Sequence, residues 1–212
     1  MNAWLKWSCV CTLLLMAALS RAAAYEDMVR AINKGEQAAV SGLLQKGLDV
    51  DAVNKEGDTL LMLAAKEGNV NVLDVVLKAK PKVNTRNALG ESALMLAAIK
   101  GHVEIVKVLL ASGAAIDHVG WTPLMYAAST NRMEVMRLLV IRGAKIDAVN
   151  SAGTTALMLA AREGQTQAVL LLMEYGANIN TQTSTGFSAL RAAKQRGQDE
   201  VARILVRAGA KE

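Results

Sequence analysis

Apolar residues recur along most of the chain with the spacing of a helix, in short segments separated by glycines. After Gly101, the residues Val103, Val106, Leu109 and Leu110 follow at intervals that place them on one helical face. Comparable segments cover residues 70–77, 133–140, 166–173 and 199–206, and earlier ones cover 26–33 and 37–45. The pattern predicts short amphipathic helices and an all-α fold.

These segments belong to an internal repeat. A glycine opens each unit, and successive opening glycines are 33, 30, 33 and 33 residues apart. A second glycine follows at positions 68, 101, 164 and 197, and Asn131, which also tolerates a left-handed backbone, stands in the matching place. The five copies begin Gly57-Asp-Thr-Leu-Leu-Met-Leu-Ala-Ala65, Gly90-Glu-Ser-Ala-Leu-Met-Leu-Ala-Ala98, Gly120-Trp-Thr-Pro-Leu-Met-Tyr-Ala-Ala128, Gly153-Thr-Thr-Ala-Leu-Met-Leu-Ala-Ala161 and Gly186-Phe-Ser-Ala-Leu-Arg-Ala-Ala-Lys194.

Two short helices and a protruding turn every 33 residues or so resemble the ankyrin repeat, whose signature centres on Thr-Pro-Leu-His-x-Ala. The resemblance covers residues 25–212 and implies an all-α ankyrin-repeat solenoid, in which stability arises at the interfaces between neighbours. We expect six units, at 25–56, 57–89, 90–119, 120–152, 153–185 and 186–212. The first and last diverge from the others, as expected of repeats whose outer faces meet water.

Two positions of the repeat have a predicted structural role. Thr or Ser at 59, 92, 122, 155 and 188 is placed to cap the first helix of each unit through its hydroxyl. Met62, Met95, Met125 and Met158 stand where the family usually has His, and Arg191 stands there in the last unit. A methionine series could suggest metal or oxidant chemistry, but methionine more often fills irregular gaps in a core, and we expect that role here.

Residues 1–24 have the order of a cleavable secretion signal. Lys6 precedes an apolar stretch from Cys9 to Leu19, and Ala22 and Ala24 fit the small residues before a cleavage site. The alternative, a membrane anchor, needs a longer apolar run. We therefore expect cleavage before Tyr25 and a periplasmic location, with secretion as the alternative and no stable membrane insertion afterwards.

Composition argues against catalysis and against nucleic-acid binding. Lys and Arg outnumber Asp and Glu by only 24 to 19 and form no run. Both cysteines lie in the predicted signal, and His102 and His118 have no partner at catalytic or metal-ligand spacing. We expect no enzyme activity, no cofactor and no metal site.

The family resemblance implies ligand binding on the concave face, which includes the turn tips and the position after each opening glycine. Trp121 and Phe187, the single Trp and Phe after residue 24, both occupy that position, and aromatics are common interface anchors. Three residues are missing before Gly120, which shortens the turn beside Trp121. The alternative is that Trp121 only packs against that turn. The remaining candidates on this face are Leu89, Ile99, Val119, Asp58, Glu91, Lys66 and Arg162.

The sequence thus predicts an exported, monomeric, non-catalytic module that binds a protein as an adaptor, an inhibitor or an immunity-type partner, with a link to stress defence left open. Two alternatives remain at this point. One is a cell-envelope structural factor that binds anionic glycan or lipid headgroups, and the other is a secreted factor that acts in a host cell.

Overall fold

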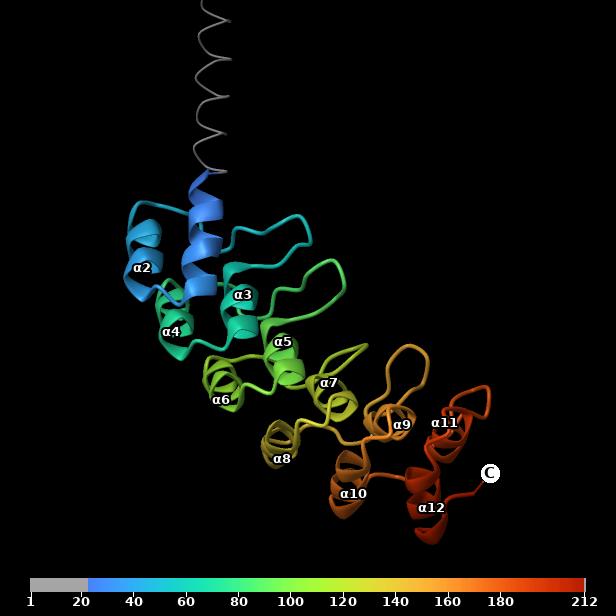
Figure 1. The fold of residues 1–212 in the computed structure, drawn as a ribbon. Coiled ribbons are helices and arrows are strands. Elements are labelled where there is room, and N and C mark those ends of the chain that lie inside the picture. The colour runs from blue at the N-terminus through green and yellow to red at the C-terminus, as the bar shows by residue number, and fades with distance from the viewer. Residues whose placement is uncertain (1–22, 212) are drawn as a thin grey trace, which may run out of the picture. The chain divides into compact units, whose positions relative to one another are not determined.

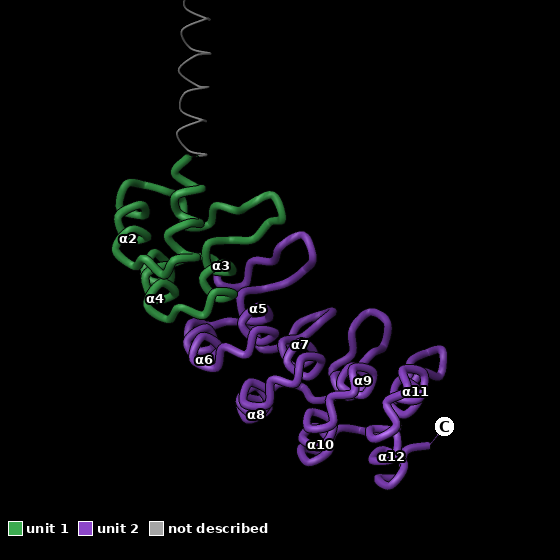
Figure 2. The backbone as a smooth tube through the Cα atoms, in the orientation of Figure 1, with its two compact units in different colours: residues 1–82 green, residues 83–212 purple. Residues whose placement is uncertain are grey.

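The computed structural model describes residues 23–211, and these form pairs of short helices joined by glycine-containing turns (Figure 1). The predicted signal at 1–24 lies outside the described residues except for its last two. No helix in the described part is long and apolar enough to span a membrane. The chain divides into two compact units, residues 1–82 and residues 83–212 (Figure 2).

The described part of unit 1 contains a helix over residues 23–34, followed by α2 (Gln37–Gln45), α3 (Leu60–Glu67) and α4 (Val70–Lys78). Helices α2 and α3 both pack against α4. Met28 and Ile32 of the first helix, Leu61 of α3 and Leu73 of α4 are fully or almost fully buried. Burial of such side chains contributes about 1.5–3 kcal/mol each, which gives unit 1 an apolar core of its own.

Unit 2 consists of four helix pairs in two layers (Figure 1). One layer contains α5 (Ala93–Lys100), α7 (Pro123–Ser129), α9 (Ala156–Arg162) and α11 (Ala189–Gln195). The other contains α6 (Val103–Ala111), α8 (Met133–Ile141), α10 (Thr166–Glu174) and α12 (Asp199–Arg207). Alanine pairs such as Ala97-Ala98 are completely buried, because small side chains let neighbouring helices of the first layer approach closely.

The predicted helix caps and glycine turns are confirmed, although the first helix, expected over 26–33, covers 23–34 of the described residues. The hydroxyls of Thr59, Ser92, Thr122, Thr155 and Ser188 each accept the backbone N–H three residues later and cap the first helix of their repeat. The second glycine of each repeat has a left-handed backbone, with φ of 79° at Gly68. Asn131 has a φ of 55°, so it replaces glycine at that turn.

The methionine series is buried, as predicted for a role in packing. Met62, Met95, Met125 and Met158 are at most 1% exposed. Two of them also have a polar contact that the sequence analysis missed. The sulfur atoms of Met62 and Met95 accept the backbone N–H of Thr59 at 3.4 Å and of Ser92 at 3.3 Å. Sulfur here takes the place of the Glu or Gln side chain in a capping box.

Candidate functional site

Three protruding turns of unit 2 are each closed by an Asn or Thr side chain. Asn87 Oδ1 accepts the backbone N–H of Leu89 at 3.0 Å and of Glu91 at 2.9 Å, and the Asn87 N–H donates to the Glu91 carbonyl at 3.0 Å. Asn150 holds Thr154 in the same way, and Thr183 holds Phe187. In these three turns the backbone of the residue after the opening glycine is therefore fixed by the turn.

The turn before Trp121 lacks this closure. Asn84, Asp117, Asp147 and Asn180 occupy equivalent positions, because each side chain accepts a backbone N–H of the following repeat. The bonded residues are 31 apart in sequence, except from Asp117 to Lys145, where they are 28 apart. The three missing residues therefore follow Asp117 and include the counterpart of Asn87. The turn is short, as the repeat spacing predicts.

Other contacts hold the short turn. The His118 Nδ1 lies 2.8 Å from the Val119 carbonyl, and an Arg86 guanidinium N–H donates to the same oxygen at 3.4 Å. Burial lowers the pKa of His118, Arg86 lowers it further, and the Val119 carbonyl and Asp117 oppose the shift. His118 is therefore neutral at pH 7, with Nδ1 as the donor to Val119 and a buried Nε2 that has no hydrogen-bond partner.

Trp121 packs against an aromatic side chain of its own repeat. Its ring centroid lies 5.0 Å from that of Tyr126, with the ring planes 40° apart, and both side chains are half-buried. Such a tilted aromatic pair contributes about 0.5–1.5 kcal/mol beyond area burial. The sequence analysis predicted a role for Trp121 but missed Tyr126, although Tyr126 stands where the repeats on either side have leucine (Leu96 and Leu159).

Tyr126 also links Trp121 to a carboxylate of the preceding repeat. Its hydroxyl donates to Glu91 Oε1 at 3.1 Å, and Asn87 Nδ2 donates to Glu91 Oε2 at 3.0 Å. Burial and the nearby Glu91 charge raise the pKa of Tyr126, so the phenol keeps its proton at neutral pH. The predicted candidates Glu91 and Trp121 are thus brought together through a residue that the sequence analysis did not select.

Exposed apolar side chains lie on the turns that carry these residues. Leu89 is 81% exposed and Val119 is 90% exposed. The bond from Arg86 to the Val119 carbonyl ties the two turns together. We call Leu89, Glu91, Val119, Trp121 and Tyr126 the Trp121 surface.

Three further candidates in unit 2 have contacts of their own. The Ile99 carbonyl accepts from Thr130 Oγ1 at 3.3 Å and from Arg132 Nε at 3.0 Å. Arg162 forms a 2.8 Å ion pair with Glu163, and the half-buried Phe187 follows a turn that is fully closed. These contacts do not involve Trp121, so Ile99, Arg162 and Phe187 are not counted in the Trp121 surface.

The last two candidates belong to unit 1. Lys66 is exposed in the last turn of α3, and Asp58 is half-buried, with its N–H bound to Asn54 Oδ1 at 2.7 Å.

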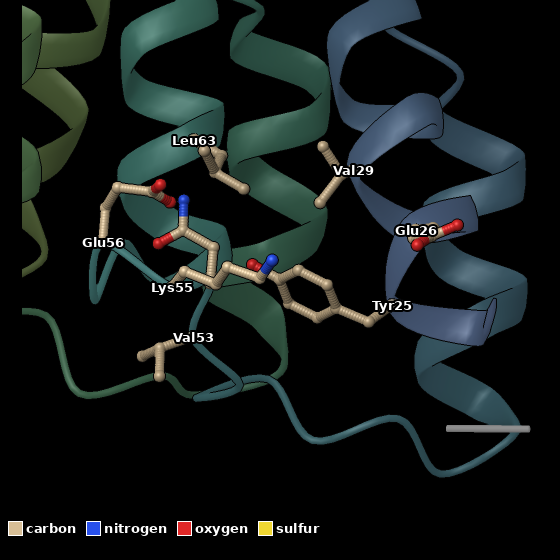
Figure 3. A pocket seen from close by; sticks show the side chains of 8 residues that line it. Tyr25, Glu26, Val29, Val53, Lys55, Glu56 and Leu63 are labelled. Carbon is tan, nitrogen blue, oxygen red and sulfur yellow. The ribbon is translucent and has the colours of Figure 1, made fainter. Parts of the chain in front are cut away.

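Unit 1 also has a hollow of about 540 Å³, one wall of which is formed by the turn at 53–56. Figure 3 shows Tyr25 and Val29 of the first helix, Val53 and Leu63 among its lining residues. Burial, Asp58 and Glu56 raise the pKa of Tyr25, whose buried hydroxyl has no hydrogen-bond partner.

Among residues 23–211 no three His, Asp or Glu side chains lie together in a way that could hold a metal ion. Apart from backbone amides, the polar groups of the Trp121 surface are the Tyr126 phenol, the Glu91 carboxylate and the Trp121 indole N–H. Such a set is suited to recognition through packing and hydrogen bonds.

Comparison with known proteins identifies the class. The family model described as "Ankyrin repeats (3 copies)" matches residues 28–118, 76–150 and 142–212. The chain belongs to the ankyrin repeat family, whose members are in general non-catalytic protein-binding modules. No curated protein sequence matches it significantly.

Solved structures place it within that family. It resembles the ankyrin repeat domain of human ASB11 (TM-score 0.79, 25% identity, 87% of this chain and 84% of that one). It also resembles a chain from the complex of a predatory endopeptidase with an immunity protein from Bdellovibrio bacteriovorus (TM-score 0.75, 28% identity, 85% and 97%). The third is the ankyrin repeat domain of Bcl-3, a member of the IkappaB family (TM-score 0.73, 32% identity, 87% and 86%).

Proposed function

We propose that this chain is an exported inhibitor or immunity-type protein that binds its partner through the Trp121 surface. One observation carries the proposal. Two highly exposed apolar side chains, Leu89 and Val119, lie on the same surface as a half-buried aromatic pair, beside a turn that lacks the closing Asn or Thr of its counterparts. Exposed apolar side chains next to aromatic anchors are typical of protein interfaces.

The inhibitory role rests on the similarity to the Bdellovibrio complex, in which an endopeptidase is bound to an immunity protein. The match covers 97% of the similar chain from that complex and 85% of this protein. Export rests on residues 1–24 alone, whose charged start, apolar middle and small residues at the end have the order of a secretion signal.

The test is a site-specific cross-link in cells that produce the protein. A photoreactive amino acid at Val119 is compared with the same group at Val206, which is 53% exposed in α12 of the same unit. We expect one protein to be captured from position 119 and not from position 206. Equal capture from both positions would show that the Trp121 surface has no special role.

A second candidate is binding to anionic glycan or lipid headgroups. Arg191 and Lys194 of α11 line a hollow of about 310 Å³ together with Ser188. Binding of anionic headgroups through such exposed charges weakens strongly as salt screens them, whereas the apolar and aromatic contacts of the Trp121 surface keep most of their strength. Affinity measured across a series of salt concentrations separates the two candidates.

A further inference from the structure

Glu91 is a half-buried carboxylate whose hydrogen bonds come from neutral groups. Its two oxygens accept from the Asn87 amide and the Tyr126 hydroxyl. Among the ion pairs of residues 23–211, none includes Glu91. A cation that reached this carboxylate would add a charge–charge attraction that its neutral donors do not supply.

The basic residues close to Glu91 in the sequence either bond to another group or lie at the other end of α5. Arg86 donates to the Val119 carbonyl, and Lys100 lies at the opposite end of α5, whereas Glu91 directly precedes the cap of that helix. Arg132 donates to the Ile99 carbonyl, also at the far end of α5. At its own end of the helix, Glu91 contacts the Asn87 amide and the Tyr126 hydroxyl, and the Trp121 ring packs against Tyr126.

We propose that Glu91, Trp121 and Tyr126 form a binding site for one basic side chain, arginine or lysine, of the protein partner. A cation near the face of Trp or Tyr is attracted by the ring quadrupole, and a carboxylate beside it supplies the opposite charge. The exposed Leu89 and Val119 offer apolar contact for the methylene stem, which long basic side chains bury along such surfaces. This inference rests on the proposed function and specifies the chemistry of the partner.

The site discriminates against a neutral apolar side chain. An aliphatic group placed there removes water from Glu91 without supplying a charge, and that desolvation is unfavourable. A basic group offsets the same loss of water through its charge. The proposal therefore predicts a preference for a charged side chain over an uncharged one of similar shape.

The test titrates the full chain with three acetylated and amidated tripeptides that have arginine, lysine or norleucine between two glycines. The indole N–H resonance of Trp121, assigned by its loss in Trp121→Phe, reports binding. We expect saturable shifts with arginine and lysine at millimolar concentration, at least about threefold larger than with norleucine. Equal shifts with norleucine would overturn the proposal, since they would show an apolar site without charge preference.

Two variants test the role of the carboxylate. Glu91→Gln keeps the side-chain shape and an acceptor for Asn87, and its NH2 can donate to the Tyr126 oxygen in place of the bond that Glu91 accepts. We expect it to weaken binding of the arginine peptide by roughly fivefold, with only a small change in melting temperature. Glu163→Gln, which removes a carboxylate already paired with Arg162, serves as the control and leaves the affinity unchanged. Unchanged affinity in Glu91→Gln would contradict the proposal.

The cross-linking experiment distinguishes failure of this inference from failure of the proposed function. If Val119 still captures the partner in a Glu91→Gln chain at full yield, the surface binds protein but does not recognise a cation. If Val119 captures nothing specific in the unaltered chain, the proposed function itself fails.

Discussion

Met95 and Met125 occupy the same position of neighbouring repeats, are equally buried, and differ in the surroundings of their sulfur atoms. The Met95 sulfur accepts the N–H of Ser92 at 3.3 Å, whereas the Met125 sulfur accepts no hydrogen bond within residues 23–211. Leucine has nearly the volume of methionine, so the packing term of a Met→Leu exchange is small, usually below about 1.5 kcal/mol. The pair therefore isolates the effect of the sulfur.

We expect Met95→Leu to lower the free energy of unfolding by about 1 kcal/mol more than Met125→Leu, because it leaves the buried N–H of Ser92 without an acceptor. Urea unfolding of both variants measures the difference. Equal losses would show that the sulfur contact contributes nothing beyond packing.

His118 provides a prediction about pH. Its pKa is lowered in the folded chain from the ordinary 6.5, chiefly by burial, so the unfolded chain binds a proton more readily. The contribution of His118 to the free energy of unfolding is fully present above pH 6.5, and it decreases as the pH drops below 6.5 towards the pKa of the folded state. When the pH is lowered from 7 to 5, we expect the melting temperature of His118→Gln to fall by less than that of the unaltered chain. A steeper loss in the variant would contradict this account, and the effect is small because the ring is only partly buried.

Among contacts between individual residues, the sequence predicts those that are local and recur in every repeat. The capping role of Thr59 and its four counterparts follows from position, because donor and acceptor are three residues apart. The bond from Tyr126 to Glu91 joins residues 35 apart, and its existence depends on how α7 lies against the preceding turn. One substitution did point to it: Tyr126 replaces a leucine that recurs in the flanking repeats.

Among the elements, the turn from Asp117 to Trp121 differs most from its counterparts. Repeat spacing alone shows that three residues are absent, and the bond from Lys145 to Asp117 shows that they follow Asp117. The sequence could not show that the absent residues are the ones that close the hairpin. That conclusion needs the contacts of Asn87 and Asn150 in the neighbouring turns.

Restoring those residues is a direct test of the element. We expect insertion of Ala-Val-Asn, the sequence of residues 148–150, after Asp117 to rebuild the hairpin and change stability by less than about 1 kcal/mol. We expect the restored residues to block the approach of a partner to Trp121, so partner affinity falls by about tenfold or more. Affinity and urea unfolding are measured on the same protein. Unchanged affinity with a rebuilt hairpin would show that the short turn is unrelated to binding.

A helix cap gives a second prediction at this scale. Thr155 is buried and its hydroxyl accepts the N–H of Met158 at the start of α9. We expect Thr155→Ala to cost about 1 kcal/mol and Thr155→Ser, which keeps the hydroxyl, to cost less than half as much. Thermal or urea unfolding compares the two, and equal losses would assign the effect to the lost methyl group.

On the scale of the whole molecule, the repeated pattern predicted the fold class from sequence, because each repeat presents the same apolar positions to its neighbours. The partner could not be predicted in that way, since the chemistry of a surface depends on side chains from several repeats. Export is a proposal that rests on residues 1–24, and cleavage before Tyr25 would remove the first two described residues of the folded chain. Ala23 is exposed and Ala24 half-buried, while Met28 is the first fully buried residue within 23–211.

Cleavage before Tyr25 therefore removes no fully buried residue of the described fold. We expect mass spectrometry of the protein recovered from its source to show Tyr25 as the first residue, and a chain that begins there to melt within about 2 °C of the full chain. Recovery of the intact chain from a membrane fraction would contradict the proposed export.

The central claim is that Trp121 acts as an interface anchor, and the variant Trp121→Ala tests it most directly. We expect partner binding to weaken by about 2 kcal/mol or more, roughly 30-fold, because anchor aromatics dominate interfaces. Since the ring is only half-buried, the loss of unfolding free energy stays below about 2 kcal/mol. Phe187→Ala, at the same position behind a closed turn, is the control and has a smaller effect on affinity. A stability loss of about 3–5 kcal/mol with unchanged affinity of the folded fraction would make Trp121 a packing residue and contradict the account.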